Sequence, residues 1–261
     1  MVDSVPQRYQ RLIVQLLSDN APGRRAMAAQ TLAEAHFPQV LRALERARDD
    51  ADPMVQRSAT VSLLRLGSAP LAIELQATLH SPTTALAIAA ATTLGDARCR
   101  RAVLEMLEVF SVCPRPLAIA IARALGAMGD KRAVAALCRA LAKPGLGETA
   151  AEALGTIADT RSVGPLLRAL SGSTSAATRA QCARSLGRIA RRLRNPEFSS
   201  TIAPALEEAM LSDDRRVRMN AALSLWQLAD PVHDESALRE LRKLSQATQP
   251  VIISGEGSAT Y

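Results

Sequence analysis

The segment from Ala124 to Leu141 reads ALGAMGDKRAVAALCRAL, and the segment from Ala153 to Leu170 reads ALGTIADTRSVGPLLRAL. The two copies are offset by 29 residues and are identical at 10 of 18 positions. A repeat period of about 20–50 residues is typical of solenoid architectures, in which each repeat is one supersecondary unit. The two copies therefore predict that the chain is an array of similar units.

Each copy combines the end of one helix with the start of the next. Gly126 carries no side chain, as expected where two helices approach closely, and Gly129 permits the left-handed turn that ends a helix. Asp130 follows as an N-cap, because its carboxylate can accept from backbone N–H groups of the next helix. The next helix then has one apolar face, formed by Val134, Leu137, Cys138 and Leu141. Helices this short must bury their apolar faces on neighbouring pairs.

This pattern resembles the HEAT-like repeat of the phycobilisome-lyase type. Weaker copies of the motif recur along the chain, at Leu66-Gly67, at Thr92 to Asp96, at Ser185 to Gly187 and at Leu225 to Asp230. The resemblance implies an all-α, right-handed α-α superhelix of about seven helical pairs plus a C-terminal capping helix. Solenoids of this kind serve many unrelated roles, so the resemblance is specific for fold and not for function.

We expect the repeat array to span residues 1–245, with a C-terminal tail at 246–261. The helices predicted from apolar periodicity are 6–17, 23–35, 37–47, 52–66, 70–79, 82–94, 98–109, 114–128, 131–141, 146–157, 161–170, 175–193, 197–211 and 213–228, with a polar capping helix at 235–245. Asp52 before Pro53 is typical of a helix start. One leucine in each pair is expected to be a buried anchor: Leu32, Leu66, Leu94, Leu125, Leu154, Leu186 and Leu225.

Composition bounds the chemistry. The 261 residues are 48% hydrophobic but only 2% aromatic, which indicates a closely packed core of small aliphatic side chains and argues against disorder. No run of apolar residues in the sequence approaches the roughly 20 residues that a membrane-spanning helix requires. The N-terminus lacks the pattern of a signal peptide. We therefore expect a cytoplasmic protein. The net charge of +7 favours an acidic partner.

No pattern of catalytic or metal-binding residues is evident. The four cysteines form no CxxC pair, and a buried free thiol behaves as a small hydrophobe. The three histidines, His36, His80 and His233, lie near predicted helix ends, and the chain has no His-Glu pair of the kind that HEAT-repeat iron hydroxylases use. No phosphate-binding or nucleophile motif appears. We expect no cofactor, no metal and no catalytic residue.

The densest basic run suggests an interaction surface. Arg184, Arg188 and Arg192 share one face of a predicted helix, and Arg191 and Arg194 lie beside them. The position of Arg184, two residues before the anchor leucine, reads Gln30, Leu64, Thr92, Arg123, Glu152, Arg184 and Leu223 along the array. A phosphate track requires repeated Lys or Arg, and base stacking requires aromatic residues, so this mixed series disfavours nucleic acid. A solvated helix face would also account for the run.

Trp226 replaces the glycine that follows the anchor leucine in other repeats, so it either fills a core gap or anchors an interface. The candidate partner-binding residues are Arg123, Glu152, Arg184, Arg188, Arg191, Arg192, Arg194 and Trp226. The first hypothesis is a non-catalytic adaptor or scaffold that binds a protein with an acidic surface. The alternatives are a subunit or chaperone of an E/F-type phycobilin lyase, which the resemblance implies, and a nucleic-acid-binding protein with a basic concave surface.

Overall fold

The described part of the chain is built entirely from helices. The computed structural model describes residues 5–173, 175–193 and 196–228, which contain fourteen α-helices and no strand. This confirms the prediction of an all-α helical-repeat fold with about seven helical pairs. The predicted capping helix at 235–245 and the tail at 246–261 lie outside the described residues. None of the described helices combines the length and apolarity that membrane crossing requires.

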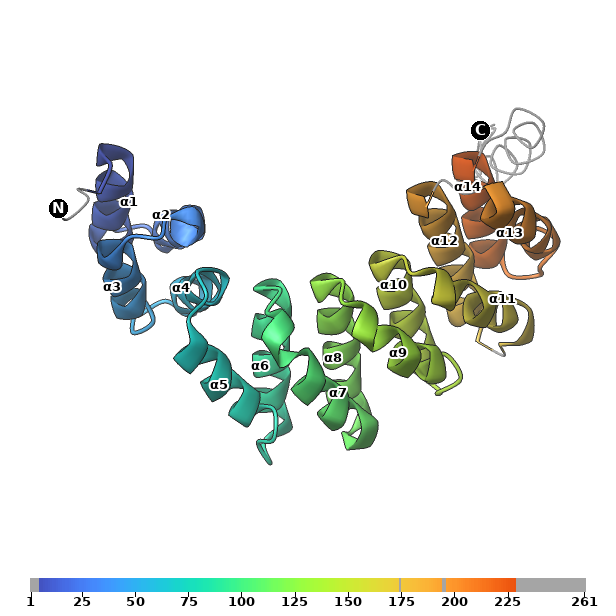
Figure 1. The fold of residues 1–261 in the computed structure, drawn as a ribbon, viewed down its shortest axis with the longest axis horizontal. Helices are drawn as coiled ribbons and strands as arrows, with labels where there is room; N and C mark the ends of the chain where they lie inside the picture. Colours follow the sequence, from blue (N-terminus) through green and yellow to red (C-terminus); the bar gives the residue numbers. More distant parts are fainter. Residues whose placement is uncertain (1–4, 174, 194–195, 229–261) are drawn as a thin grey trace, which may run out of the picture. The chain divides into compact units, whose positions relative to one another are not determined.

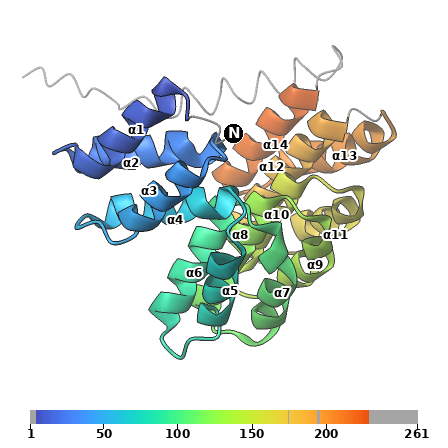
Figure 2. The same ribbon diagram turned by 60° about the vertical axis from the view of Figure 1, so that its left-hand side comes forward.

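The chain divides into two compact units, Met1–Pro165 and Leu166–Tyr261. The described part of the first unit contains five helical pairs. They follow one another along the chain (Figures 1 and 2). Their first helices are α1 (Gln7–Ser18), α3 (Pro38–Ala47), α5 (Ala69–Thr78), α7 (Val103–Val112) and α9 (Val134–Ala140). Their second helices are α2 (Pro22–Thr31), α4 (Pro53–Arg65), α6 (Thr84–Asp96), α8 (Arg115–Met128) and α10 (Gly147–Ile157). Within this unit, α2, α4, α6 and α8 each contact the second helix of the next pair.

The second unit contains the remaining helices. These are α11 (Val163–Gly172), which enters the unit at Leu166, α12 (Ala176–Leu193), α13 (Pro196–Ala209) and α14 (Arg215–Leu228). The helices α12 and α14 pack side by side, as the second helices do in the first unit.

Close approach of the second helices depends on residues without bulky side chains. A Cβ atom built on Gly95 would lie 2.7 Å from Cβ of Ala124, and one on Gly126 would lie 2.8 Å from Cα of Ala153. These distances are shorter than carbon atoms tolerate, so the glycine and the small residue define the spacing between the helices. Gly187 meets Ser224 in the same way in the second unit. The predicted role of Gly126 as a point of close approach is confirmed.

Six of the seven predicted anchor leucines are fully buried: Leu32, Leu94, Leu125, Leu154, Leu186 and Leu225. The seventh prediction, Leu66, is wrong, because this side chain is only half-buried at the end of α4. Leu63 takes the anchor position and is 1% exposed. The preceding Ser62 donates its hydroxyl to the carbonyl of Ala29 at 2.9 Å, as Ser224 before Leu225 donates to Ala183 at 3.0 Å.

A left-handed residue ends the second helix of four successive pairs. Gly67, Arg98, Gly129 and Ala158 have φ values of 92°, 52°, 64° and 55°. Gly129 thus ends α8 as predicted, and Asp52 accepts from the N–H of Met54 as the predicted cap of α4. Asp130 also caps as predicted, accepting from the N–H of Arg132. The segment that it caps is a short 3-10 helix, Lys131–Ala133, which precedes α9 and was not predicted from the sequence.

Candidate interaction surfaces

A groove lies on the second helices of the first unit. It lies between α6 and α8 and has a volume of about 340 Å³. Its lining is mainly small and aliphatic, with one cation and one carboxylate: Ile88, Thr92, Gly95, Asp96, Pro116, Ile119, Ala120, Arg123, Ala124 and Ala127. Gly95 and Ala124, which approach each other closely, both line it. Such a groove can accept a ligand in which an apolar side chain lies next to a negatively charged group.

Two predicted site residues lie on this face. Arg123 is exposed on α8 and Glu152 is exposed on α10. The two helices are neighbours, but within the described part of the chain neither side chain forms an ion pair. The first unit therefore presents one cation and one anion here, as expected from the alternation of residues at this repeat position.

The predicted arginine run lies on α12 in the second unit. Arg184, Arg191 and Arg192 are exposed, and Arg188 is half-buried. Arg184 and Arg191 have no hydrogen-bond or ion-pair partner among the described residues, whereas Arg188 and Arg192 do make interactions. Arg194 falls outside the described residues, so the structure gives it no place.

Trp226 is exposed on α14. Its side chain is 48% exposed, and Met219, seven residues earlier on the same helix, is 38% exposed. Leu223 lies between them on this face and is half-buried. Because Trp226 is not buried, the alternative in which it fills a core gap does not hold. Since α12 and α14 pack side by side, the arginines of α12 and the apolar residues of α14 belong to neighbouring helices of one unit.

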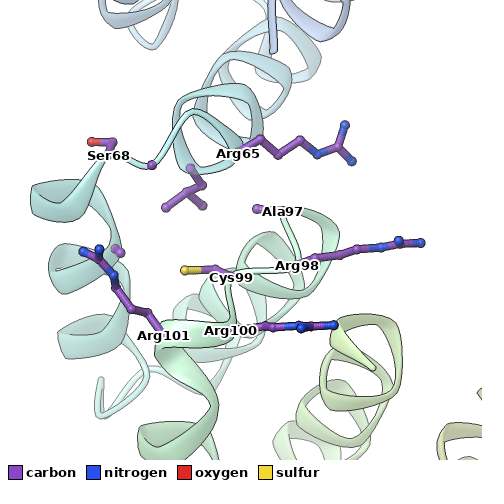
Figure 3. A pocket seen from close by; sticks show the side chains of 10 residues that line it. Arg65, Ser68, Ala97, Arg98, Cys99, Arg100 and Arg101 are labelled. Atoms are coloured by element: carbon purple, nitrogen blue, oxygen red, sulfur yellow. The ribbon is translucent and has the colours of Figure 1, made fainter. Parts of the chain in front are cut away.

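A cluster of arginines in the first unit was missed by the sequence analysis. A pocket of about 270 Å³ lies where the turn after α4 meets the turn after α6 (Figure 3). It is lined by Leu64, Arg65, Gly67, Ser68, Ala72, Ala97, Arg98, Cys99, Arg100 and Arg101. The sequence signal was Arg98-Cys99-Arg100-Arg101, a dense basic tetrapeptide at a turn. Arg65 joins it only through the fold, from 33 residues earlier in the chain.

The carboxylates at the next two turns already form hydrogen bonds with arginines. Asp130 accepts from the guanidinium of Arg132 at 2.7 Å, and Asp159 accepts from that of Arg161 at 2.8 Å. These hydrogen bonds, aided by the backbone N–H of the same arginines, hold the pKa of both carboxyl groups below the ordinary value. Arg132 also donates to the carbonyl of Arg100 at 3.0 Å, so it joins two successive turns. We assign these pairs a structural role.

Where they are described, the histidines and cysteines form no metal-binding group. His36 is exposed, and His80 is exposed with its ring nitrogen on the carboxylate of Glu105. Within the described ranges, no group of three or more His, Cys, Asp or Glu side chains could hold a metal ion. Burial raises the pKa of the Cys182 thiol to about 12, which keeps it protonated and poorly nucleophilic. His233 lies outside the described residues.

Comparison with known families identifies the class of protein. Residues 144–225 match HEAT repeats, and residues 117–143 match the PBS lyase HEAT-like repeat. The protein is therefore a helical-repeat protein. More particularly, its repeats over residues 117–225 are HEAT-like.

Solved structures of helical-repeat proteins are similar to the chain at low sequence identity. The complex of CpcE and CpcF of phycocyanin lyase from Nostoc sp. matches with 19% identity and a TM-score of 0.42, over 93% of this chain and 96% of that chain. A designed armadillo repeat protein matches with 16% identity and a TM-score of 0.38, over 84% and 99%. Human deoxyhypusine hydroxylase matches with 19% identity and a TM-score of 0.34, over 92% and 94%. No curated protein matches the sequence significantly.

Proposed function

We propose that the protein is a non-catalytic, cytoplasmic adaptor or scaffold that binds an acidic protein surface through α12 and α14. The observation that carries this proposal is the combination of two exposed guanidiniums, on Arg184 and Arg191, with the exposed Trp226 on the neighbouring helix. Neither guanidinium has a partner among the residues that the structure describes. Arginine and tryptophan are the residues most enriched among those that dominate the energy of protein interfaces.

Charge and exposure favour a protein partner over a nucleic acid. Arginines concentrated on one helix can meet a matching acidic patch and set its orientation and association rate. A nucleic-acid backbone requires cations repeated along its path. At the equivalent position in the first unit, Glu152 follows Arg123 on the next helix. The aromatic side chains needed for base stacking are represented on α12 and α14 by Trp226 alone.

The test begins with affinity capture from native lysate and identification of the bound proteins by mass spectrometry. The affinity of the identified partner is then measured for Arg184→Glu, Arg191→Glu and Trp226→Ala. Each variant should weaken binding at least about tenfold, which corresponds to about 1.4 kcal/mol. Arg188 and Arg192 are left unchanged, because they make interactions within the protein.

Arg168→Glu is the matched control. Arg168 is exposed on α11 of the same unit, so its reversal changes the net charge equally but leaves α12 and α14 intact. It should bind the partner like the wild type, and all variants should keep the wild-type helical circular dichroism. Equal loss in Arg168→Glu and Arg184→Glu would contradict the proposal. So would submicromolar binding of random duplex DNA at physiological salt that Arg184→Glu abolishes.

A role as a subunit or chaperone of an E/F-type phycobilin lyase is the second candidate. It is favoured by the match of residues 117–143 to the PBS lyase HEAT-like repeat. The test is to incubate the purified protein, alone and with candidate partner subunits, with a bilin and an apo-phycobiliprotein. A bilin absorbance that stays with the phycobiliprotein under denaturing conditions would support this role, and its absence in every combination would exclude it.

A further inference from the structure

We propose that Arg65, Arg98 and Arg100 of the first unit form a binding site for a dianionic phosphate group, free or carried as a phosphomonoester. The site lies at the arginine-lined pocket between the turn after α4 and the turn after α6. It is separate from the α12 and α14 surface and does not depend on the adaptor function proposed above.

The three side chains extend in the same direction. In Figure 3, Arg65, Arg98 and Arg100 lie side by side and reach away from the turns on one side, whereas Arg101 and the thiol of Cys99 point to the other side. Arg65 comes from the end of α4, Arg98 from the turn after α6, and Arg100 from the short helix Arg100–Ala102 that follows it. The fold therefore gathers three guanidiniums from two successive repeats into one row.

Two of these side chains are held in place by the backbone. The guanidinium of Arg65 donates to the carbonyl of Asp96 at 3.0 Å, and Nε of Arg100 donates to the carbonyl of Met128 at 3.4 Å. Each of these bonds uses one donor and leaves the other guanidinium N–H groups available. The side chain of Arg98 makes no hydrogen bond or ion pair to any described residue. The row is thus partly preorganised and has unused donors.

The row keeps an excess of positive charge over the carboxylates near it. The charges of Asp130 and Arg100 act on each other, but this carboxylate is already hydrogen-bonded to Arg132. The pocket lining contains no acidic side chain. The nearest acidic residue in the sequence, Asp96, has its carboxylate paired with Arg57. Three like charges held together repel one another, and an anion bound among them would relieve this repulsion. The positive charge of the row therefore favours an anionic ligand.

Arg98 also has an unusual backbone conformation. Arg98 occupies the left-handed turn position that is glycine at Gly67 and Gly129. A non-glycine residue there is conformationally unfavourable, and the side chain of Arg98 gains no hydrogen bond to a described residue in return. Residues held in such conformations are concentrated at functional sites. Because Ala158 shares this conformation at a later turn, the backbone alone does not indicate a ligand, and it is the unused donors of Arg98 that indicate one.

A phosphate group matches the row better than other anions. Guanidinium groups bind phosphate oxygens in bidentate geometry, and a phosphomonoester carries nearly two negative charges near neutral pH. A carboxylate carries a single charge and two oxygens. The phosphodiester of a nucleic acid is a monoanion, and its binding requires cations along a track. A row of three guanidiniums that extend to one side of two turns thus favours a terminal phosphate.

The experiment measures binding of inorganic phosphate and of a phosphoserine peptide to the full chain by isothermal titration calorimetry. The non-phosphorylated peptide and a random DNA duplex serve as comparison ligands. We expect saturable phosphate binding with a Kd of about 1 mM or below, and at least about tenfold weaker binding for Arg98→Gly and for Arg65→Gln. A phosphopeptide bound tenfold more tightly than inorganic phosphate would assign the ligand to a phosphorylated protein segment. Equal affinities would assign it to free phosphate.

Two matched controls separate the site from the turn and from net charge. Ala158→Gly relieves the same backbone strain at a left-handed turn that has no arginine. Arg101→Gln removes a positive charge from the other side of the pocket. Both should bind phosphate like the wild type. Arg98→Gly should melt at or above the wild-type temperature, so lost binding cannot be attributed to unfolding. The proposal is overturned if the wild type shows no saturable phosphate binding, if Arg98→Gly binds normally, or if the DNA duplex outcompetes the phosphate ligands.

Discussion

Gly126 shows how one missing side chain sets the distance between two helices. The added Cβ would approach Cα of Ala153 to 2.8 Å and Cβ to 2.9 Å, and both atoms are close to the backbone and cannot rotate away. An alanine here would gain up to about 1 kcal/mol of helix propensity. It would also force α8 and α10 apart, and overpacking of this kind costs about 1–3 kcal/mol.

We therefore expect Gly126→Ala to lower the free energy of unfolding by about 1–2 kcal/mol, since the steric cost outweighs the gain in propensity. Gly23→Ala is the control, because a Cβ at Gly23 in the first turn of α2 meets no atom within 4 Å. This variant should be neutral or slightly more stable. Denaturation in urea, followed by circular dichroism, measures both. A Gly126→Ala protein as stable as Gly23→Ala would show that the helices can separate without loss.

Residue-level prediction from sequence succeeded where the repeat is regular. The motif around Gly126 and Gly129 fixes both the anchor leucine and the turn, and the structure confirms both roles. It failed at Leu66, because a leucine before a glycine marks the end of a helix as readily as an anchor. The exposure of Trp226 and the row formed by Arg65 with Arg98 depend on packing between repeats, which local periodicity does not encode.

At the scale of the helix, Asp159 illustrates how the turns between pairs are stabilised. Its side chain is 7% exposed and accepts hydrogen bonds from both the side chain and the backbone N–H of Arg161. The side-chain hydrogen bond is the largest cause of the lowered pKa, and the backbone bond and the charges of Arg161 and Lys131 act in the same direction, against the opposing effect of burial. The carboxylate thus begins the following 3-10 helix, Thr160–Ser162, in its charged form.

This lowered pKa makes stability depend on pH in a defined direction. As the pH falls, the unfolded chain takes up the proton first, at the ordinary carboxyl pKa of about 3.9. The contribution of Asp159 is therefore complete above that pH and is lost as the pH falls through the lower pKa of the folded state. Asp159→Asn retains a capping oxygen but cannot titrate. We expect it to be about 1–3 kcal/mol less stable than the wild type at pH 7.

The difference between Asp159→Asn and the wild type should shrink below about pH 4. Thermal unfolding at a series of pH values measures this convergence. Glu152→Gln, which removes an exposed carboxylate of the same unit, is the control and should stay within about 0.5 kcal/mol of the wild type. A deficit in Asp159→Asn that stays constant down to low pH would mean that the charge of Asp159 contributes nothing.

Helix boundaries were largely predictable, because caps and apolar periodicity are local signals. The predicted helix at 114–128, for example, corresponds to α8 at Arg115–Met128. The four short 3-10 helices were not predicted as separate elements: Leu32–Glu34, Arg100–Ala102, Lys131–Ala133 and Thr160–Ser162. In the last two, the aspartate caps the N–H two residues later, so the chain enters a tighter turn before the α-helix begins. A cap predicts where a helical segment starts, but not whether its first turn is 3-10 or α.

For the whole molecule, the division into two compact units makes it possible to ask whether a packing defect in one unit also destabilises the other. In repeat proteins, stability is the sum of terms for each repeat and for its neighbours. Leu125 is fully buried in α8 of the first unit, and its replacement by alanine should cost about 2–5 kcal/mol. Leu104→Ala is the control, because Leu104 is 58% exposed on α7 of the same unit.

Two cysteines can report on the two units separately. Cys182 is fully buried in α12 of the second unit, and burial raises its pKa to about 12, so at pH 8 it should be alkylated only after local opening. Cys138 is half-buried in α9 of the first unit. Each thiol becomes reactive at a particular urea concentration. We expect Leu125→Ala to lower this concentration more for Cys138 than for Cys182, because the lost contacts act first on neighbouring repeats. Pulsed alkylation with peptide mass spectrometry measures both thiols in one sample, and Leu104→Ala should shift neither. Equal shifts of Cys138 and Cys182 in Leu125→Ala would instead show that the two units unfold as one cooperative body.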